Sequence, residues 1–382
     1  MAEKVLLVTT TSGFVPQFEM NNVKYLQSLG FEIHYASNYH TPIYGKDNSR
    51  LDGTGIIRHQ IDFVRSPFRL SNIKVLRELV KLMKEEKFVL IHCHTPMGGV
   101  LGRLAAWISK NGVVMYTAHG FHFYEGAPLI NRLLYKTMEW TLAHITDVLV
   151  TINQEDYQAA LTFKMKKGGA VFYAPGIGID CKRFSTIENK RQEMRNQYQL
   201  QPDDFLLITC GELIKRKNHE AILKALTYIK DSHIKLILCG SGVLEQDIRQ
   251  KIREYGLEKR VFMIGYCYNI PEHLKEADCF VFPSYQEGLP VALMEAMASG
   301  LPVVCSRIRG NVDLIVQEEG GFLVDPSDID GFATSILKLK ENYKLRQQMG
   351  AFNAERIQQF DVEVVKRKMQ DIYQFAIEKT GK

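Results

Sequence analysis

The sequence has no long apolar run. No window among its 382 residues offers the roughly 18 uninterrupted apolar residues that a membrane-spanning helix needs. The longest candidate, residues 289–305, contains a glutamate and two prolines. The first residues also lack the apolar core of a signal peptide, because Lys4 is followed only by Val5 to Val8 before a polar stretch. We therefore expect a cytoplasmic protein without a membrane span.

Motifs for metal and dinucleotide binding are missing as well. The seven cysteines are scattered and form no CxxC pair, which predicts reduced core residues and no zinc site. The first predicted strand, Lys4 to Thr10, is not followed by GxGxxG, so an NAD-dependent dehydrogenase is disfavoured. His92 and His94 lie on one side of another predicted strand, but no third ligand follows at a telling spacing. We expect no metal and no cofactor.

Strong positive charge is absent from the chain as a whole but present in one segment. The net charge is only +5, so nucleic acid is not an expected partner. Between Arg65 and Lys87, however, seven basic residues stand against three acidic ones. The amphipathic helix predicted over residues 72–87 has two open interpretations, a solvated helix packed on a sheet or a helix lying on an anionic bilayer. Phe68 and Leu70, placed beside arginines, support the second and predict peripheral contact with the inner face of the membrane.

The length and the alternation of elements predict two α/β domains. A chain of 382 residues fits two domains of roughly 180 residues. Short, nearly continuous apolar runs alternate with helical patterns, which is typical of parallel sheets covered on both faces. The turn-rich stretch Ala174 to Asp180 is the natural boundary. It separates an N-terminal domain, 1–178, from a C-terminal domain, 179–360.

The stretch from Pro283 to Val304 contains a helix start without a cap. An apolar strand ends at Pro283, and a helix is predicted from Pro290 to about Ser299. Gly288 and Leu289, just before it, have no side chain able to cap the helix. The amides of Val291, Ala292 and Leu293 are therefore expected to lack a local acceptor, and such a helix start attracts an anion such as a phosphate.

Two glutamates frame this helix start. Glu295 is the only charge in the helix VALMEAMAS, and Glu287 lies eight residues earlier in the loop. A largely buried carboxylate needs a partner, and two neighbouring sugar hydroxyls can both donate to it. For isolated glutamates the alternative is a capping or ion-paired Glu287 and a salt-bridged Glu295. Their combination with the glycine and the uncapped helix favours a nucleotide-sugar site.

The string PSYQEGLPVALMEAMASGLPVV, with both glutamates, closely resembles the signature of the retaining family-four glycosyltransferases. The resemblance extends over nearly the whole chain and implies the α/β fold called GT-B. This fold has two Rossmann-like domains with parallel sheets facing a central cleft, an acceptor-binding N-terminal domain and a nucleotide-sugar-binding C-terminal domain. It also implies a C-terminal helix, 361–382, that crosses back to the N-terminal domain. The string HGFHFY at 119–124 resembles the bacterial capsular and exopolysaccharide branch.

The same resemblance implies residue roles. His119 would contact the donor sugar and its phosphate, and Lys217 would bind the departing phosphates. The family's arginine after Gly211 is Glu212 here, so Arg216 or Lys215 would have to supply the second positive charge. The residues expected to be catalytic are His119, Lys217 and Glu287. Those expected to bind substrate are Gly13, His94, Arg216, Gly240, Ser241, Tyr266, Gly288, Leu289, Pro290, Val291 and Glu295.

The function expected from the resemblance is metal-independent, retaining transfer of a hexosyl or N-acetylhexosaminyl group. The donor would be a nucleotide sugar, expected to be UDP-linked, and the acceptor a glycan or a polyprenyl-diphosphate-linked sugar in bacterial surface polysaccharide synthesis. Glu212 motivates an alternative, a catalytically weak GT-B protein that binds nucleotide sugar or serves as a scaffold in a polysaccharide assembly complex. A monomer or weak dimer is expected.

Overall fold

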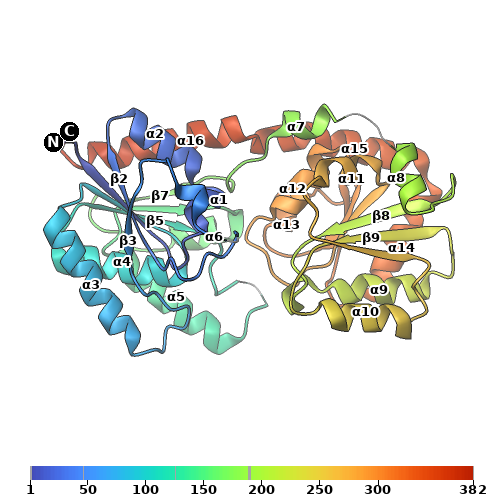
Figure 1. The fold of residues 1–382 in the computed structure, drawn as a ribbon, viewed down its shortest axis with the longest axis horizontal. Helices are drawn as coiled ribbons and strands as arrows, with labels where there is room; N and C mark the ends of the chain where they lie inside the picture. Colours follow the sequence, from blue (N-terminus) through green and yellow to red (C-terminus); the bar gives the residue numbers. More distant parts are fainter. Residues whose placement is uncertain (1, 46, 125, 188–190, 382) are drawn as a thin grey trace. The chain divides into compact units, whose positions relative to one another are not determined.

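The computed structural model describes residues 2–45, 47–124, 126–187 and 191–381. The chain forms two compact units (Figure 1). The N-terminal unit comprises Met1–Ile177 and Glu363–Lys382, and the C-terminal unit comprises Gly178–Val362. The boundaries expected from the sequence are 178/179 and 360/361. Within the described residues, no helix is both long enough and apolar enough to cross a lipid bilayer.

The N-terminal unit is a seven-stranded parallel sheet with helices on both faces. The strand order is β3-β2-β1-β4-β5-β6-β7. Its strands are β1 (Lys4–Val8), β2 (Glu32–Ser37), β3 (Ile57–Gln60), β4 (Leu90–Cys93), β5 (Val113–Ala118), β6 (Val148–Thr151) and β7 (Ala170–Tyr173). Its helices are α1 (Phe14–Phe18), α2 (Met20–Ser28), α3 (Ser71–Glu86), α4 (Pro96–Ser109), α5 (Leu129–Ala143), α6 (Gln154–Leu161) and α16 (Val362–Glu378), with a 3₁₀ turn η1 at Ser49–Leu51.

Alternate residues of β1 explain why this sheet is covered on both sides. Leu6 and Val8 pack into the apolar cluster that α3 and α4 close, whereas Val5 and Leu7 pack into the cluster on the opposite face. That second cluster contains Met369 of α16, so the last helix completes the core of the N-terminal unit. Figure 1 shows the two layers, with α2 and α16 above the sheet and α3, α4 and α5 below it. The continuous apolar strands of the sequence therefore have the physical cause that was predicted for them.

The C-terminal unit repeats this plan with a six-stranded parallel sheet in the order β10-β9-β8-β11-β12-β13. Its strands are β8 (Phe205–Cys210), β9 (Ile234–Cys239), β10 (Val261–Gly265), β11 (Cys279–Phe282), β12 (Val303–Ser306) and β13 (Gly321–Val324). Its helices are α7 (Cys181–Ser185), α8 (Arg191–Gln197), α9 (His219–Tyr228), α10 (Glu245–Glu254), α11 (Ile270–Glu276), α12 (Val291–Ala298), α13 (Asn311–Leu314), α14 (Ile329–Glu341) and α15 (Tyr343–Arg356), with 3₁₀ turns η2 (Lys215–Lys217) and η3 (Ile357–Phe360). The predicted α/β fold with two parallel sheets is confirmed.

Each sheet has one point at which the strand order reverses. In the N-terminal unit it lies between β1 and β4, and in the C-terminal unit between β8 and β11. The connections after two such strands run to opposite sides, which leaves a crevice at the carboxyl ends where open α/β sheets bind ligands. The loops that leave β8 and β11 are therefore the first place to look for a site in the C-terminal unit.

Candidate functional site

Three of the predicted residues meet at the reversal point of the C-terminal sheet. Lys217, in the loop after β8, donates a hydrogen bond from Nζ to Glu287 Oε1 at 2.7 Å. Arg216 places its guanidinium 3.2 Å from the other oxygen of that carboxylate and donates to the carbonyl of Gln286 at 2.7 Å. The Glu287 side chain is buried, so its ion pairs with Lys217 and Arg216 are shielded from solvent at the carboxylate, although the Arg216 side chain is 40% exposed.

Backbone and amide hydrogen bonds fix the two loops against each other. Asn218 closes η2 in a left-handed conformation with a φ of 52°. From there its side-chain amide donates to the carbonyls of Pro283 and Pro326, each at 3.0 Å. The amide of Tyr285 donates to the carbonyl of Arg216 at 2.8 Å. The positions of Arg216 and Lys217 therefore depend on the loop after β11 as much as on their own.

The uncapped helix start is present but shifted from the prediction. Helix α12 begins at Val291, and Pro290 is its N-cap with an extended ψ of 118°. No side chain among the described residues caps it. The amide of Leu293 donates to the carbonyl of Pro290 at 3.2 Å, so the prediction that Leu293 lacks an acceptor is wrong. Within the described chain, the amides of Val291 and Ala292 remain without an acceptor, which keeps the helix start attractive to an anion.

Glu295 lies one turn beyond this start, on the same face as Val291. The other residues of that turn are buried, and Glu295 is only partly exposed. Its carboxylate makes no hydrogen bond or ion pair with any residue that the structure describes. Burial raises the pKa of Glu295 to about 7, and the positive charge of Arg183 opposes this rise. A salt-bridged Glu295 is therefore not observed, and its carboxylate remains available to an external donor.

The loops after β9 and β10 complete this edge of the sheet. Gly240 has a φ of 150°, and a Cβ there would lie 1.9 Å from the carbonyl oxygen of Gly211. The carbonyl of Ser241 accepts a hydrogen bond from Leu213 at 3.0 Å, so the loops after β8 and β9 are in contact. Tyr266, just after β10, is exposed and packs edge-on against Tyr268 at 4.8 Å between ring centroids. Close packing of the two backbones therefore explains the glycine at position 240, and its predicted contact with substrate stays a prediction.

Gly288 and Leu289 precede α12 in a tightly packed loop. A Cβ on Gly310 would lie 2.3 Å from the carbonyl oxygen of Gly288, so two backbone segments touch here. Leu289 is buried. Sequence reasoning missed the buried Arg309, whose Nε donates to the backbone carbonyl of Glu287 at 3.1 Å. Its signal was its place in the loop that follows strand β12, where ligand-binding residues of such sheets are found.

His94 and His119 come together in the N-terminal unit. Nδ1 of His94 lies 3.2 Å from Nε2 of His119, and the ring of Phe14 packs against both. His94 is fully buried, whereas His119 is partly exposed. Burial lowers the pKa of His119 to about 4 and that of His94 well below its usual value. Both are neutral at pH 7, and only His119 is placed to meet a ligand directly.

His92 and His94, for which no metal was expected, lie beside a third possible metal ligand, Glu19. Glu19, His92 and His94 are buried and offer ligand atoms that lie within 4.8 Å of one another. The two ring nitrogens of His92, however, already contact Tyr373 Oη at 2.7 Å and Thr117 Oγ1 at 2.8 Å. A cation would have to displace one of these hydroxyls, so the group is a poor cation site. Asp203, Asp204 and His233 form a second such group.

Gly13 lies in the loop after β1, where it touches a second loop. A Cβ at Gly13 would lie 1.6 Å from the carbonyl oxygen of Ile43, so glycine is required at this contact. Gly13 itself is buried. Backbone packing before α1 therefore explains the glycine without a ligand, and its predicted contact with substrate stays a prediction.

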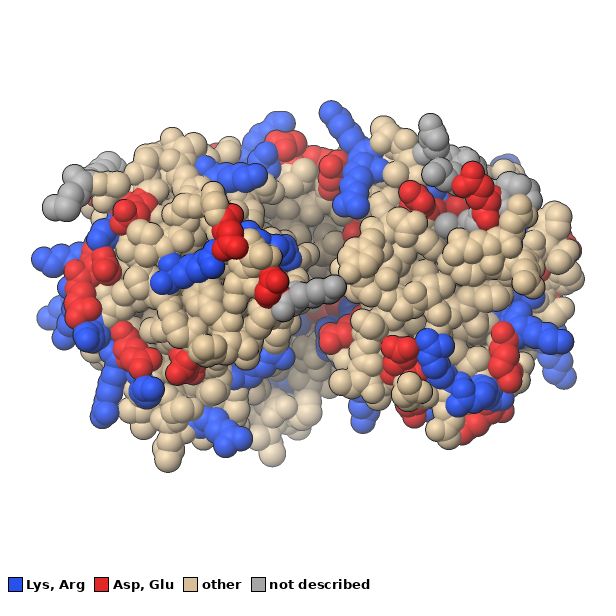
Figure 2. Space-filling model, viewed as in Figure 1, with Lys and Arg blue, Asp and Glu red and all other residues tan. Residues whose placement is uncertain are grey.

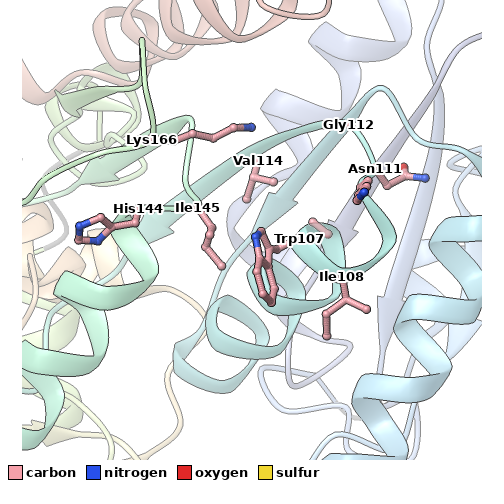
Figure 3. A pocket seen from close by; sticks show the side chains of 10 residues that line it. Trp107, Ile108, Asn111, Gly112, Val114, His144, Ile145 and Lys166 are labelled. Atoms are coloured by element: carbon pink, nitrogen blue, oxygen red, sulfur yellow. The ribbon is translucent and has the colours of Figure 1, made fainter.

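A pocket in the N-terminal unit lies away from the predicted site residues. It has a volume of about 680 Å³ and is lined by residues from the end of α4, the start of β5 and the segments before β6 and β7. Figure 3 shows Trp107 and Ile108 on one side of it and His144 and Lys166 on the other. These residues lie at the amino ends of the strands, opposite the edge at which His94 and His119 follow β4 and β5. The predicted site residues therefore do not line this pocket.

Comparisons with known proteins find glycosyltransferases for both halves of the chain. A family model described as "Glycosyl transferases group 1" matches residues 190–356, and one described as "Glycosyl transferase 4-like" matches residues 4–152. The putative glycosyltransferase EpsD of Bacillus subtilis is 33% identical over 98% of this chain and 97% of its own. An Escherichia coli protein named UDP-Gal:alpha-D-GlcNAc-diphosphoundecaprenol alpha-1,3-galactosyltransferase is 30% identical, with 80% of each chain covered. The structure of Anabaena HepE in complex with UDP superposes with a TM-score of 0.77 at 20% identity, covering 98% of this chain and 100% of the other.

Proposed function

The chain belongs to the group 1 glycosyltransferases, and from this membership we propose that it transfers a sugar from a UDP-linked donor with retention of configuration. The acceptor we propose is a glycan or a polyprenyl-diphosphate-linked sugar in bacterial surface polysaccharide synthesis. The observation that carries the proposal is the placement of Lys217 and Arg216 on Glu287, four residues before the uncapped start of α12, in the loops at the reversal point of the C-terminal sheet. A UDP complex of a similar fold and a relative named for a UDP-sugar support the choice of nucleotide.

The positions of the charged groups suggest a separate place for each of three parts of the donor: the diphosphate, the ribose and the transferred sugar. The diphosphate would lie against the amides of Val291 and Ala292 and near Lys217, since both attract an anion. Glu295, one turn further along α12, would accept hydrogen bonds from the two ribose hydroxyls. The sugar would lie toward Glu287 and the backbone from Gly288 to Pro290.

Retention would arise from attack on the same face as the departing diphosphate. Both carboxylate oxygens of Glu287 are already engaged by Lys217 and Arg216, which makes this group a poor nucleophile. The cations instead would stabilise the negative charge that develops on the leaving phosphate. That phosphate would accept the proton of the incoming hydroxyl, so no enzyme nucleophile is required.

Transfer assays with defined donors test this function. UDP-glucose, UDP-galactose and their N-acetylated forms would each be incubated with a polyprenyl-diphosphate-linked acceptor, and the anomeric configuration of the product read by NMR. We expect one donor to give an α-linked product, the configuration of the sugar in the donor. An inverted product would contradict retention. Saturable UDP binding without transfer or donor hydrolysis would favour the scaffold alternative.

We also propose that the segment before α3, and not α3 itself, contacts an anionic membrane. Helix α3 packs Val75, Leu79 and Met83 into the core, as the solvated interpretation required. Two of its lysines pair with glutamates at 3.6 and 3.8 Å, and Figure 2 shows basic and acidic side chains mixed in this region. Phe68 and Leu70, by contrast, are 80% and 83% exposed beside Arg65 and Arg69. Apolar side chains next to arginines suit an anionic bilayer surface.

Substitution of Leu70 by serine is expected to weaken binding to vesicles of anionic phospholipid about tenfold, because inserting one leucine contributes about 1.5 kcal/mol. Co-sedimentation over a range of lipid concentrations measures the effect. Val243→Ser is the matched control, since Val243 is 87% exposed, lies in the C-terminal unit and has no basic residue within five positions of it in the sequence. Equal loss in both variants, or equal binding to neutral vesicles, would contradict a specific contact through Leu70.

A further inference from the structure

His119 lies in a short stretch of backbone that is held at both ends. On its amino side, Ala118 still belongs to β5 and is paired in register with β6. On its carboxyl side, the amide of Phe121 donates a hydrogen bond to Oδ2 of Asp156 in α6 at 3.0 Å. Only His119 and Gly120 lie between these two points. The position of His119 therefore depends on where Asp156 holds the backbone.

Gly120 makes this short connection sensitive to its surroundings. Its φ of 128° lies in a region that favours glycine. Because glycine can also adopt many other conformations at little cost, contacts on either side must fix the one that is observed. The hydrogen bond to Asp156 is one such contact. The buried ring of Phe121 makes others, packing against Phe123 and Phe163 at 4.7 and 5.9 Å between ring centroids.

Asp156 is itself fixed at the start of α6, where only 1% of it is exposed. Its backbone amide donates to Oδ1 of Asn153, the N-cap residue, at 2.8 Å. The side-chain amide of Asn153 donates in return to Oδ2 of Asp156, also at 2.8 Å. An acid in the first turn stabilises a helix from an exposed position as well, so this role does not require burial. The bond from Phe121 gives a reason for a buried carboxylate here.

The His119 side chain has close neighbours, so a shift of its backbone would change what it can reach. Its Nε2 lies 3.2 Å from Nδ1 of His94, and the ring of Phe14 packs edge-on against it at 4.9 Å between centroids. The remaining part of the ring is accessible, because His119 is partly exposed. A misplacement of about 1 Å, even one caused far from the chemistry, can lower the rate of an enzyme about 10²-fold.

We propose that Asp156 is a positioning residue, which holds the Phe121 amide and thereby keeps His119 at the carboxyl end of β5, where it meets the donor sugar. Asp156 is buried and acts only through the backbone of the loop. The role of His119 rests on the proposed function. The anchoring of the loop rests on hydrogen bonds within the N-terminal unit alone.

Three substitutions separate the anchor from the helix cap. Asp156→Ala removes the acceptor that faces the Phe121 amide and also weakens the start of α6. Asn153→Ala is the matched control, because it removes the N-cap oxygen but leaves Asp156 in place to accept from Phe121. Asp156→Asn keeps an oxygen acceptor and should behave nearly as the wild type does. If Asp156→Ala does not fold, Asp156→Ser replaces it, since a hydroxyl can still bond at the start of α6 but is too short to reach the Phe121 amide.

Hydrogen exchange of the Phe121 amide reports the anchor directly. It is measured by NMR on protein labelled with nitrogen-15 phenylalanine, and the Phe121→Leu variant assigns the signal. We expect slow exchange in the wild type and in Asn153→Ala, and exchange at least about tenfold faster in Asp156→Ala. Slow exchange that persists in Asp156→Ala would show that packing of the Phe121 ring holds the loop, and would overturn the proposal.

Kinetics provide a second readout. Asp156→Ala should lower kcat/KM for sugar transfer about tenfold, whereas Asn153→Ala should stay close to the wild type. Asp156→Asn should restore most of the loss. In a His119→Ala background the Asp156→Ala change should have no further effect, because the group that it positions is gone. An additive effect, or an equal loss in Asn153→Ala, would contradict positioning through His119.

The two readouts separate this inference from the proposed function. If the Phe121 amide is released in Asp156→Ala but the wild-type protein transfers no UDP-sugar, the proposed function fails and the anchor of the loop stands. If the wild type transfers sugar and Asp156→Ala matches it in spite of rapid exchange at Phe121, the proposed function stands and the positioning role of Asp156 is refuted.

Discussion

Replacing Lys217 by alanine is expected to lower kcat/KM for sugar transfer by about 10²–10³-fold, corresponding to about 2.7–4 kcal/mol of lost transition-state stabilisation. The ammonium group is nearly buried against the ring of Phe282, 4.9 Å away, and lies at the point where the two central loops meet. A charge held there before the reaction stabilises a developing phosphate anion without further reorganisation. Steady-state assays of UDP release and of product formation measure the loss.

Two variants control this experiment. Lys215→Ala removes an exposed lysine of the same turn and should leave kcat/KM within about twofold, since an exposed charge contributes little. The double variant Lys217→Ala/Glu287→Gln tests whether the defect comes only from leaving the buried carboxylate with one cation. Recovery of full activity in the double variant would show that Lys217 serves only to neutralise Glu287.

Glu295→Gln is expected to weaken UDP binding about 10–100-fold and yet make the ligand-free protein more stable at pH 8. Binding weakens because the amide retains one acceptor where the carboxylate offers two to the ribose, and a hydrogen bond to a charged group contributes about 1.5–3 kcal/mol. Isothermal titration with UDP measures this loss. An ordinary salt-bridged glutamate would give the opposite effect on stability.

The sign of the stability change follows from the pKa of Glu295. In the folded protein burial raises that pKa from 4.5 to about 7, so the folded state binds the proton more tightly than the unfolded state does. Stability is therefore lost as the pH rises from about 4.5 to about 7, and the Glu295→Gln substitution removes this loss because the amide does not ionise. The gain should be about 1–3 kcal/mol at pH 8 and near zero at pH 4.

Thermal unfolding at the two pH values, with and without UDP, checks this prediction. Glu319→Gln makes the same chemical change at an exposed position and should alter neither stability nor UDP binding. A Glu295→Gln protein that unfolds more easily at pH 8 would show that the carboxylate has a stabilising partner after all.

The fold could be predicted because local patterns carry it. Apolar runs of strand length alternate with helical patterns, and buried parallel strands require this composition whatever their neighbours are. The strand order could not be read from such patterns, because it depends on which strands pair over long distances. The first residue of α12 was also predicted one position too early, because proline fits both the N-cap and the first helical position.

The candidate site was predictable where residues lie close together in the sequence. Glu287, the helix start and Glu295 fall within one stretch, and the basic loop follows directly after a strand. The burial of Glu19 was not predicted, because nothing in the sequence around it indicates a buried position. Its neighbour in the structure, His94, lies 75 residues away in the sequence. The role of Arg309 could not be predicted, because its hydrogen bond goes to a backbone carbonyl and every residue type offers such an acceptor.

The pairing of β8 with β11 makes the proposed nucleotide site dependent on the completion of folding. Lys217 and Glu287 are 70 residues apart and become neighbours only when these two parallel strands join. Long-range parallel pairing is slow, because the intervening chain must be ordered before the contact forms. A bound nucleotide would favour the joined sheet by mass action. We therefore expect that during synthesis the chain begins to bind nucleotide only after β11 has paired with β8.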